Sequence, residues 1–166
     1  MIIKDITSQL PFKTSLGTRT LSSITGVVVH HTAAKQDARP ALERIKADAN
    51  YHVSKGWGHL SYHYMIDKAG NVYLCVPEKE IGAHAGDWAY NKGTIAVCMD
   101  GDLTAERLNT LQVSALWSLL DHLCTERPDL TGVVAGTVRT HREVRPTPTA
   151  CPSDRVQKMV DAYRVL

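Results

Sequence analysis

The sequence Val27-Val28-Val29-His30-His31-Thr32 sets three valines directly before a pair of histidines. A short run of valines is typical of a buried β-strand, because branched side chains pack well on a pleated surface. Successive side chains on a strand point to opposite faces of the sheet, so His30 and His31 are expected to face opposite ways. One metal ion would therefore take only one of the two histidines as a ligand.

A second stretch with ligand-type side chains runs from Thr140 to Ser153 and reads T-H-R-E-V-R-P-T-P-T-A-C-P-S. It places His141 and Cys151 ten positions apart, and its three prolines exclude a regular helix or a central strand. Both side chains are then expected on a stiff, turning loop. Two histidines and one thiolate make three protein ligands, which is typical of a catalytic zinc site with one open position.

The composition is that of a globular domain. The chain has 166 residues, of which 43% are hydrophobic and 22% charged, enough for one domain with a substantial core. Its net charge is only +2, and no basic cluster is interleaved with aromatic residues, so no nucleic-acid partner is expected. No apolar run reaches the length of a membrane span, and the N-terminus lacks the pattern of a secretory signal. We therefore expect no membrane insertion.

The four cysteines form no CxxC pair. Cys75 and Cys98 lie in apolar, strand-like runs, and Cys124 lies in a helical one. The pattern predicts three reduced, buried thiols that behave as small hydrophobic side chains. It also favours synthesis in a reducing, cytoplasmic compartment.

Strand-like and helical patterns alternate along the chain, which predicts an α/β domain with a mixed central β-sheet flanked by helices. Residues 1–23 are expected to form an N-terminal arm packed on a single domain of residues 24–166. In the strand-like run Ser61–Asp67, Tyr62, Tyr64 and Ile66 should share one face. The other expected strands span residues 24–30, 72–76, 94–99 and 133–138. Helices should begin at Pro40, Thr104 and Ser153, and the second should bury Leu108, Leu111, Leu119 and Leu123 and end at Pro128.

Eight histidines are present, and they cannot all be ligands. His122 is most simply a packed histidine of the long helix, and His59 and His63 flank the aromatic strand. His84 lies in Gly82-Ala83-His84-Ala85-Gly86, a loop of small residues from which an imidazole could reach a substrate. The pattern alone leaves the role of His52 open.

Five strings follow one another in the chain: V-V-V-H-H-T, S-Y-H-Y-M-I-D, G-A-H-A-G, N-K-G-T-I-A-V and H-R-E-V-R-P-T-P-T-A-C-P. Together they resemble the zinc-dependent N-acetylmuramoyl-L-alanine amidases, a superfamily that includes phage amidase endolysins and peptidoglycan-recognition proteins. The likeness covers residues 24–165. It implies the peptidoglycan-recognition-protein-like amidase fold, one Zn²⁺ per chain, and hydrolysis of the amide bond between N-acetylmuramic acid and L-alanine in peptidoglycan.

Carried over position by position, the resemblance implies that His30, His141 and Cys151 bind the zinc ion. The residues expected to line the substrate groove are His84, Asn91 and Trp57. With no signal and no second wall-binding domain in the sequence, we expect a monomeric phage or prophage endolysin that acts on the cell wall after release from the host cytoplasm. A cytoplasmic recycling amidase is the alternative.

Two further residues receive catalytic roles from the resemblance. Tyr62 matches a tyrosine that assists at the reacting carbonyl. Thr149 matches a position held by lysine in some phage members and by threonine in recognition proteins, and it could equally hold the turn of the ligand loop. Cys98 occupies a position where some cytoplasmic members have a glutamate that acts as general base, so the proton acceptor is left open. Glu143 is a candidate by its chemistry, although in the family it is expected to orient the loop.

Three other functions would use the same residues. A non-catalytic peptidoglycan-binding module would keep the groove, but such proteins tend to lose a zinc ligand, whereas all three are present here. A structural zinc site normally closes with four protein ligands, and no fourth candidate accompanies them. A Cys–His peptidase would use Cys151 as its nucleophile and would survive a chelator.

Overall fold

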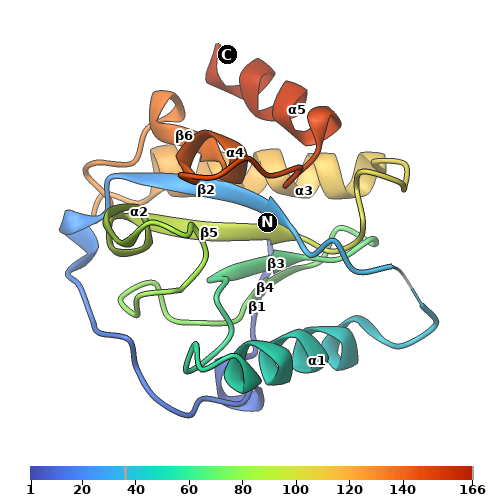
Figure 1. Cartoon of the computed structure of the whole chain (residues 1–166). Helices are drawn as coiled ribbons and strands as arrows, with labels where there is room; N and C mark the ends of the chain where they lie inside the picture. The colour runs from blue at the N-terminus through green and yellow to red at the C-terminus, as the bar shows by residue number, and fades with distance from the viewer. Residues whose placement is uncertain (36, 166) are drawn as a thin grey trace.

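A six-stranded mixed β-sheet forms the centre of the structure, a computed structural model that describes residues 1–35 and 37–165 (Figure 1). The strand order is β1-β4-β3-β5-β2-β6, and every neighbouring pair is parallel except β3 and β4. The predicted α/β domain with a mixed central sheet is therefore confirmed. The strands are β1 (Ile3–Asp5), β2 (Gly26–His31), β3 (Tyr64–Ile66), β4 (Val72–Leu74), β5 (Thr94–Met99) and β6 (Val138–Thr140).

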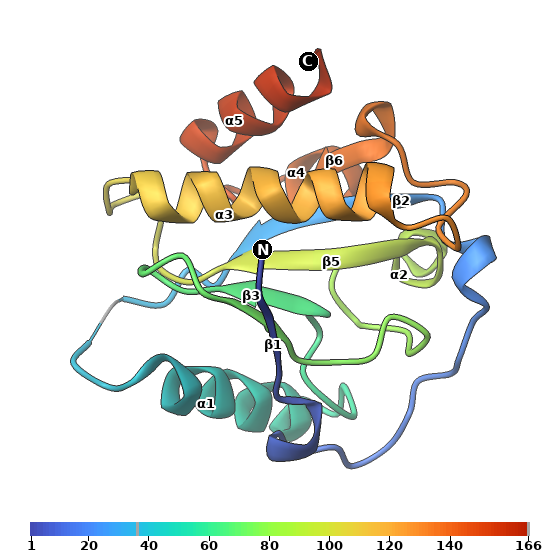
Figure 2. The same ribbon diagram turned by 180° about the vertical axis from the view of Figure 1, so that it is seen from behind.

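Helices cover both faces of the sheet, with α1 on one face and α3 and α5 on the other (Figure 2). One core cluster fills the space between the sheet and α3 and α5, and a smaller one lies between the sheet and α1. None of the helices in the described residues is long and apolar enough to cross a membrane. The α-helices are α1 (Ala41–Ser54), α2 (Trp88–Gly93), α3 (Thr110–Asp121), α4 (His141–Val144) and α5 (Asp154–Arg164).

Short helical turns connect these elements: η1 (Thr7–Gln9), η2 (Leu21–Ser23), η3 (His122–Glu126) and η4 (Ala135–Thr137). Residues 1–23 contribute the edge strand β1, which pairs with β4, before they run along the surface. The side chain of Arg19 anchors this segment. It is buried, and it donates to the backbone carbonyls of Glu78, Asn91, Lys92 and Thr94. The N-terminal segment thereby holds the loop that leads into β5.

The long third helix begins later than predicted. The side chain of Asn109 caps α3 by accepting from the backbone N–H groups of Leu111 and Gln112. Thr104 instead donates to Asp102 in the preceding turn. Because the helix starts at Thr110, its buried face shifts, and Leu111 is 57% exposed, so the prediction for Thr104 and Leu111 is wrong. The buried leucines are Leu116, Leu119, Leu120 and Leu123.

Two predicted strands also differ from the structure. The run 133–138 is mostly the turn η4, and the strand it leads to is Val138–Thr140. In the run 61–67, Tyr64 packs in the core beneath α3, whereas Tyr62 packs with the cluster beneath α1. The carbonyl of His63 accepts from two successive N–H groups, those of Cys75 and Val76, so the regular alternation ends at His63. The prediction that Tyr62 shares a face with Tyr64 is therefore wrong.

The free thiols are buried to different extents. Cys75 and Cys98 are almost fully buried, as predicted, and burial raises the pKa of the Cys98 thiol well above its usual range. Cys124 is only half-buried and lies in η3. The prediction of a fully buried thiol is wrong for Cys124.

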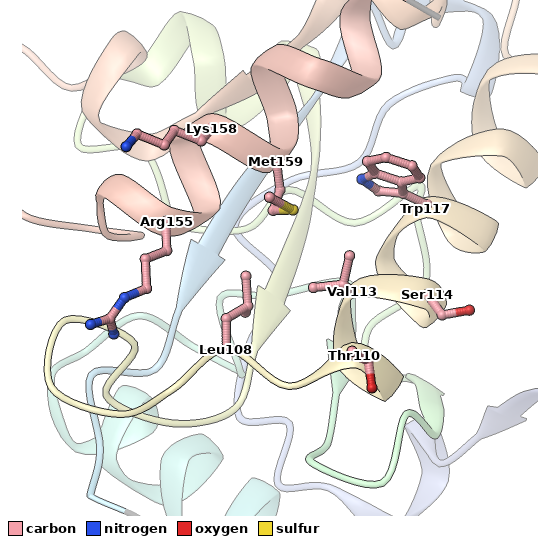
Figure 3. A pocket seen from close by; sticks show the side chains of 8 residues that line it. All are labelled: Leu108, Thr110, Val113, Ser114, Trp117, Arg155, Lys158 and Met159. Carbon is pink, nitrogen blue, oxygen red and sulfur yellow. The ribbon is translucent and has the colours of Figure 1, made fainter.

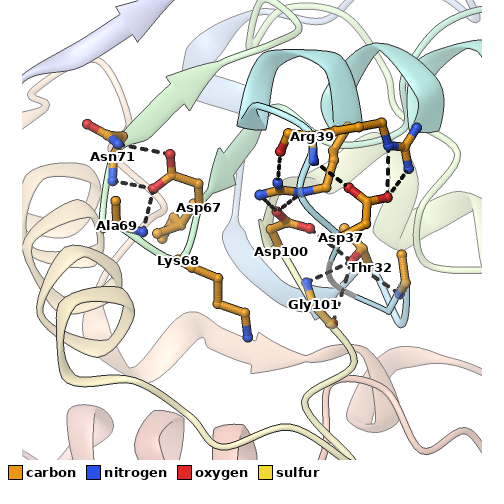
Figure 4. A network of polar contacts seen from close by, with 12 residues as sticks. Thr32, Asp37, Arg39, Asp67, Lys68, Ala69, Asn71, Asp100 and Gly101 are labelled. Atoms are coloured by element: carbon orange, nitrogen blue, oxygen red, sulfur yellow. Dashed lines mark hydrogen bonds and ion pairs between the residues drawn. The ribbon is translucent and has the colours of Figure 1, made fainter.

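A pocket of mainly apolar lining lies between α3 and α5, with Leu108, Val113, Trp117 and Met159 around it (Figure 3). A polar network holds α1 to the sheet on the other side of the molecule (Figure 4). Arg44 of α1 donates twice to Asp100, which directly follows β5. The hydroxyl of Thr32, just after β2, accepts from the N–H of Gly101 at 2.9 Å. The ends of β2 and β5 and the start of α1 are thus fixed relative to one another.

Candidate metal centre and groove

The first candidate ligand, His30, lies near the end of β2 and is almost fully buried. Val28, two positions earlier, packs with Ala85 and Val144, whereas Val27 and Val29 face the core beneath α3. His31 faces the α3 side, where its Nδ1 accepts from the N–H of Leu103 at 3.1 Å. The two neighbouring histidines therefore face opposite ways, and only His30 points into the candidate site.

The second candidate ligand, His141, opens α4 directly after β6, so the prediction that His141 lies on an irregular loop is wrong. The helix ends at Val144, before the first proline of the stretch, so the prolines exclude a helix only after that point. The start of this helix is fixed by a capping box, in which the Glu143 carboxylate accepts from the N–H and the hydroxyl of Thr140. The backbone of Ala85 hydrogen-bonds the His141 ring, and its Nε2 is buried without a hydrogen-bond partner in the described residues. A buried, unpaired ring nitrogen is costly, and a metal ion is one partner that would satisfy it.

The third candidate ligand, Cys151, ends the proline-rich loop that follows α4. Its Sγ accepts from the N–H of His31 at 3.5 Å and lies 4.0 Å from His30 Nδ1. The N–H of Cys151 donates to Thr149 Oγ1 at 3.2 Å, which holds the turn before the thiol. Arg142 supports the same loop by donating to the carbonyl of Ala150.

These residues fit a zinc ion. One ligand-type atom from each of His30, His141 and Cys151 lies within 4.8 Å of the others. Tetrahedral zinc with N and S ligands needs separations of roughly 3.5 Å between ligand atoms, so a small contraction would complete the shell. Burial lowers the pKa of His30 well below its usual range and is the main cause of the lowered pKa of His141, about 4. Both rings are thus neutral and able to ligate.

The thiol of Cys151 responds to burial in the opposite direction. Burial raises its pKa to about 11, against weaker opposing effects of the His31 N–H and of the charges on Arg142 and Arg145. A divalent cation would stabilise the thiolate and displace the proton. Metal binding at this site would therefore release one proton near neutral pH.

His84 is buried, and its ring lies next to the ring of His30. Its Nδ1 lies 3.0 Å from His30 Nε2, and its own Nε2 lies 3.4 Å from Thr94 Oγ1. If His30 offers the lone pair of Nδ1 to a metal, its Nε2 carries the proton and donates to His84. His84 would then set the tautomer and ring orientation of the ligand.

We expect the His84→Ala variant to bind zinc about 10- to 100-fold more weakly than the parent, because an unsupported ligand ring can turn and change tautomer. Competition with a chromogenic chelator measures this affinity. Thr110→Ala, on the opposite side of the sheet, is the matched control and should bind zinc as the parent does. An unchanged zinc affinity in His84→Ala would show that His84 does not support the ligand.

Tyr62 lies beside the candidate ligands. Its ring centroid is 5.3 Å from that of His30 and 5.4 Å from that of His52. Burial raises the pKa of Tyr62 well above its usual range, and the thiol groups of Cys98 and Cys151 act in the same direction. The phenol therefore stays protonated and can donate a hydrogen bond at any working pH.

The predicted groove residues gather around one pocket of about 250 Å³. Trp57, His84 and Asn91 line it together with His141. Asn91 is buried, and its Oδ1 accepts from the N–H groups of His84 and Ala85, so it shapes the loop that carries His84. The indole of Trp57 is partly exposed and packs 4.9 Å from the His52 ring. Of the three side chains, Trp57 is the most exposed at the pocket.

Neither the Cys98 thiol, which stands at the position of the glutamate base, nor the candidate Glu143 is suited to accept a proton. Cys98 is buried, and its raised pKa keeps the thiol neutral. For Glu143, partial burial opposes ionisation, but bonds from Arg164 and Thr140 outweigh it and lower the pKa to about 2. Such a carboxylate is a poor base near neutral pH. Glu143 orients the loop through its capping bonds, as expected from the family.

Asp48 was not among the predicted site residues. It lies on α1 one turn before His52, on the inward side of the helix, and its charge acts on both Tyr62 and Cys98. Burial and then the neighbouring Asp100 raise the pKa of Asp48 to about 6. An acidic residue between the buried Ile45 and Ala49 breaks the apolar face of the helix, and this break was the available signal in the sequence.

The other histidines have structural partners. His52 Nδ1 accepts from the N–H of Ser61, and His63 Nδ1 accepts from the N–H of Ala96. His59 stacks on Phe12, and His122 pairs with Glu126 near the surface. The candidate metal centre thus draws on two of the eight histidines, with His84 as the support of one of them.

A mixed sheet covered by helices on both faces, with a buried His–His–Cys cluster beside a groove, defines an α/β domain with a candidate metal centre. Residues 20–154 match the N-acetylmuramoyl-L-alanine amidase family, and the chain belongs to that family. This confirms the resemblance noted from the five sequence strings.

Individual relatives come from both branches of the superfamily. The endolysin of Escherichia phage T7 is 29% identical over 136 residues, covering 79% of this chain and 82% of that protein. Peptidoglycan-recognition protein SC2 of Drosophila simulans is 29% identical over 147 residues, covering 87% of this chain and 74% of that protein. The solved structure of the amidase LysC from Clostridium intestinale superposes with a TM-score of 0.74 at 20% identity, covering 98% and 97% of the two chains. The last likeness supports the fold alone.

Proposed function

We propose that the protein is a zinc-dependent hydrolase of the amide bond between N-acetylmuramic acid and L-alanine in peptidoglycan. The observation that carries the proposal is the cluster of His30, His141 and Cys151, whose ligand-type atoms lie within 4.8 Å of one another beside a groove. Three protein ligands leave a coordination position for water or substrate. Zinc held there supplies Lewis-acid polarisation of a carbonyl and lowers the pKa of water.

The chain's own residues supply positioning and hydrogen bonds. The phenol of Tyr62 is protonated and interacts with the Cys98 thiol, and we propose that its hydroxyl donates instead to the oxygen of the reacting carbonyl as negative charge develops on it. His84 holds the orientation of His30, and the capping box at Thr140 holds that of His141. Trp57 and Asn91 line the pocket beside His141, which supports the proposal that a glycan-peptide would bind there.

The similarity to phage endolysins supports the more specific proposal that the protein is a monomeric endolysin that lyses the cell wall after release from the host cytoplasm. Its 29% identity to the phage T7 endolysin covers most of both chains. Purified protein added to outer-membrane-permeabilised cells should clear the suspension, and chelation of zinc should stop the clearing. Light scattering and sedimentation measure lysis and the oligomeric state.

A non-catalytic peptidoglycan-binding module is the second candidate, favoured by the similarity to peptidoglycan-recognition proteins. Mass spectrometry of digested peptidoglycan separates the two functions. The amidase should release stem peptides with free L-alanine N-termini. Binding without any new N-terminus would support the module, and reducing sugar ends would indicate a glycosidase.

For Thr149 we propose two roles that its hydroxyl can combine. Its oxygen accepts from the N–H of Cys151 in the ligand loop. Its proton remains free to donate to the developing oxyanion, as a neutral and therefore weaker donor than lysine.

We expect Thr149→Ala to lower kcat per bound zinc by roughly tenfold, the loss of one neutral hydrogen bond of about 1.4 kcal/mol in the transition state. Thr149→Lys should keep more activity than Thr149→Ala. Zinc content and kcat are measured on the same samples. A purely structural role would give the reverse result, with zinc retention or thermal stability reduced and kcat per zinc unchanged.

A further inference from the structure

Arg145 lies at the wall of the groove, and its positive charge has no role in the reaction proposed above. It directly follows α4 and lines the same pocket as His141, His84 and Asn91. Within residues 1–35 and 37–165, its side chain forms no hydrogen bond or ion pair. Arg142, three residues earlier, differs, because its guanidinium is held by Asp154 and by the carbonyl of Ala150.

The side chain of Arg145 is supported by Gly86 on the opposite loop. A Cβ at Gly86 would lie 3.5 Å from Arg145 Cγ and 3.7 Å from its Nε, so the arginine stem rests against the glycine. Gly86 has φ +71°, a conformation that favours glycine. The guanidinium is thereby positioned across the loop that also carries His84.

The charge of Arg145 reaches the metal-ligand cluster. After burial, it is the next cause of the lowered pKa of His141, and it also acts on Cys151. An unpaired guanidinium this close to a reaction site is suited to bind an anion, and its planar fork matches a carboxylate with two parallel hydrogen bonds.

We propose that Arg145 binds a free carboxylate of the peptidoglycan stem peptide and so makes the enzyme selective for stems that carry it. The inference rests on the proposed amidase function. In the substrate, the carboxyl groups of the lactyl unit and of L-alanine are both consumed in amide bonds. When the second stem residue is a diacid, one of its carboxyl groups continues the stem, and the other is the nearest free carboxylate. Two residues span at most about 7 Å, which is within reach of a side chain that lines the same pocket as His141.

The experiment compares two soluble muropeptides that differ only in the second stem residue, which carries a carboxylate in one and a carboxamide in the other. The zinc-loaded parent should show kcat/KM at least about tenfold higher for the carboxylate. Arg145→Gln should bring this ratio close to one, mainly through a higher KM for the carboxylate substrate. Arg145→Lys should restore only part of the preference, because lysine lacks the planar fork.

Lys158→Gln is the charge-matched control, since Lys158 lies on the far pocket between α3 and α5 (Figure 3) and should keep the parent ratio. Equal hydrolysis of both substrates by the parent would overturn the Arg145 proposal and leave the amidase function standing. An equal fall of kcat/KM for both substrates in Arg145→Gln would likewise overturn the Arg145 proposal and leave the amidase function standing. If the parent hydrolyses neither muropeptide, the proposed amidase function fails. Calorimetry then tests the Arg145 proposal. Binding of the carboxylate muropeptide that is tenfold weaker in Arg145→Gln than in the parent supports the proposal, and unchanged binding overturns it.

Discussion

Replacement of Cys151 by alanine should remove both the zinc ion and the activity. Among the residues that the structure describes, the thiolate is one of three clustered candidate ligands, and its loss leaves two neutral imidazoles without this anionic partner. Loss of a residue that only orients a ligand lowers metal affinity by about 10- to 100-fold. We expect the loss of the Cys151 ligand itself to lower zinc affinity by more than that. A bound metal contributes several kcal/mol to transition-state stabilisation, so activity at low zinc should fall by about 10³-fold or more.

The pH dependence of zinc binding distinguishes ligand loss from general damage. In the metal-free protein the pKa of Cys151 is raised to about 11 and that of His141 is lowered to about 4. Between these values only the thiol proton competes with the metal, so the parent's zinc affinity should rise about tenfold per pH unit from pH 6 to 9. Cys151→Ala should lose this slope.

Cys124→Ala provides the matched control, because Cys124 is a half-buried thiol in η3 and not in the ligand loop. It should retain one zinc per chain and the parent slope. Full retention of zinc in Cys151→Ala, measured by elemental analysis after gel filtration, would show that this sulfur is not a ligand. A Cys–His peptidase would also lose activity in Cys151→Ala. The parent protein distinguishes the two functions, because a peptidase would stay active in the presence of a chelator, whereas the zinc enzyme would not.

The direction of the metal-site side chains could be read from local sequence because a strand has a fixed period. Once 27–30 is a strand, His30 and His31 must face opposite sides, and the structure places them so. The proline-rich loop similarly excludes regular structure around Cys151. Ser153 was predicted to cap the last helix, and its side chain accepts from the N–H of Val156 in α5.

Predictions from periodicity were wrong where tertiary contacts change the regular strand or helix. Tyr62 leaves the face of Tyr64 where the His63 carbonyl accepts from the N–H groups of Cys75 and Val76, which directly follow β4 and lie far from Tyr62 in the sequence. The start of α3 was missed because Thr104 and Asn109 are both good caps, and local sequence does not decide between them. In the structure Leu103 and Leu108 pack against the core before the helix, and Asn109 is the cap.

Partnerships across the groove could not be predicted from spacing. His84 was expected to reach a substrate, yet its nearest ring partner is His30, from a strand far earlier in the chain. Arg145 and Gly86 meet only because α4 and the loop 82–86 pack together over Val28. These pairs of residues can be recognised only from the folded structure, in which the sheet brings their loops together.

Replacement of Tyr62 by phenylalanine should leave the zinc site intact and remove most of the turnover. The substitution keeps the ring that lies 5.3 Å from His30 and 5.4 Å from His52, so packing beneath α1 is preserved. It deletes only the hydroxyl, a donor that the raised pKa keeps protonated. A donor aimed at an oxyanion is worth about 2.7–4 kcal/mol, so kcat should fall by 10²- to 10³-fold.

The KM and zinc content of Tyr62→Phe decide whether the hydroxyl acts in the transition state. An interaction made only with developing charge lowers kcat and kcat/KM equally and leaves KM near the parent value. Tyr64→Phe is the matched control, because its hydroxyl is bound to Glu78 in the core beneath α3 and cannot reach the groove. That variant should lose some stability and keep its kcat. If Tyr62→Phe instead raises KM at constant kcat, the hydroxyl binds ground-state substrate, and oxyanion stabilisation would have to come from the metal and Thr149.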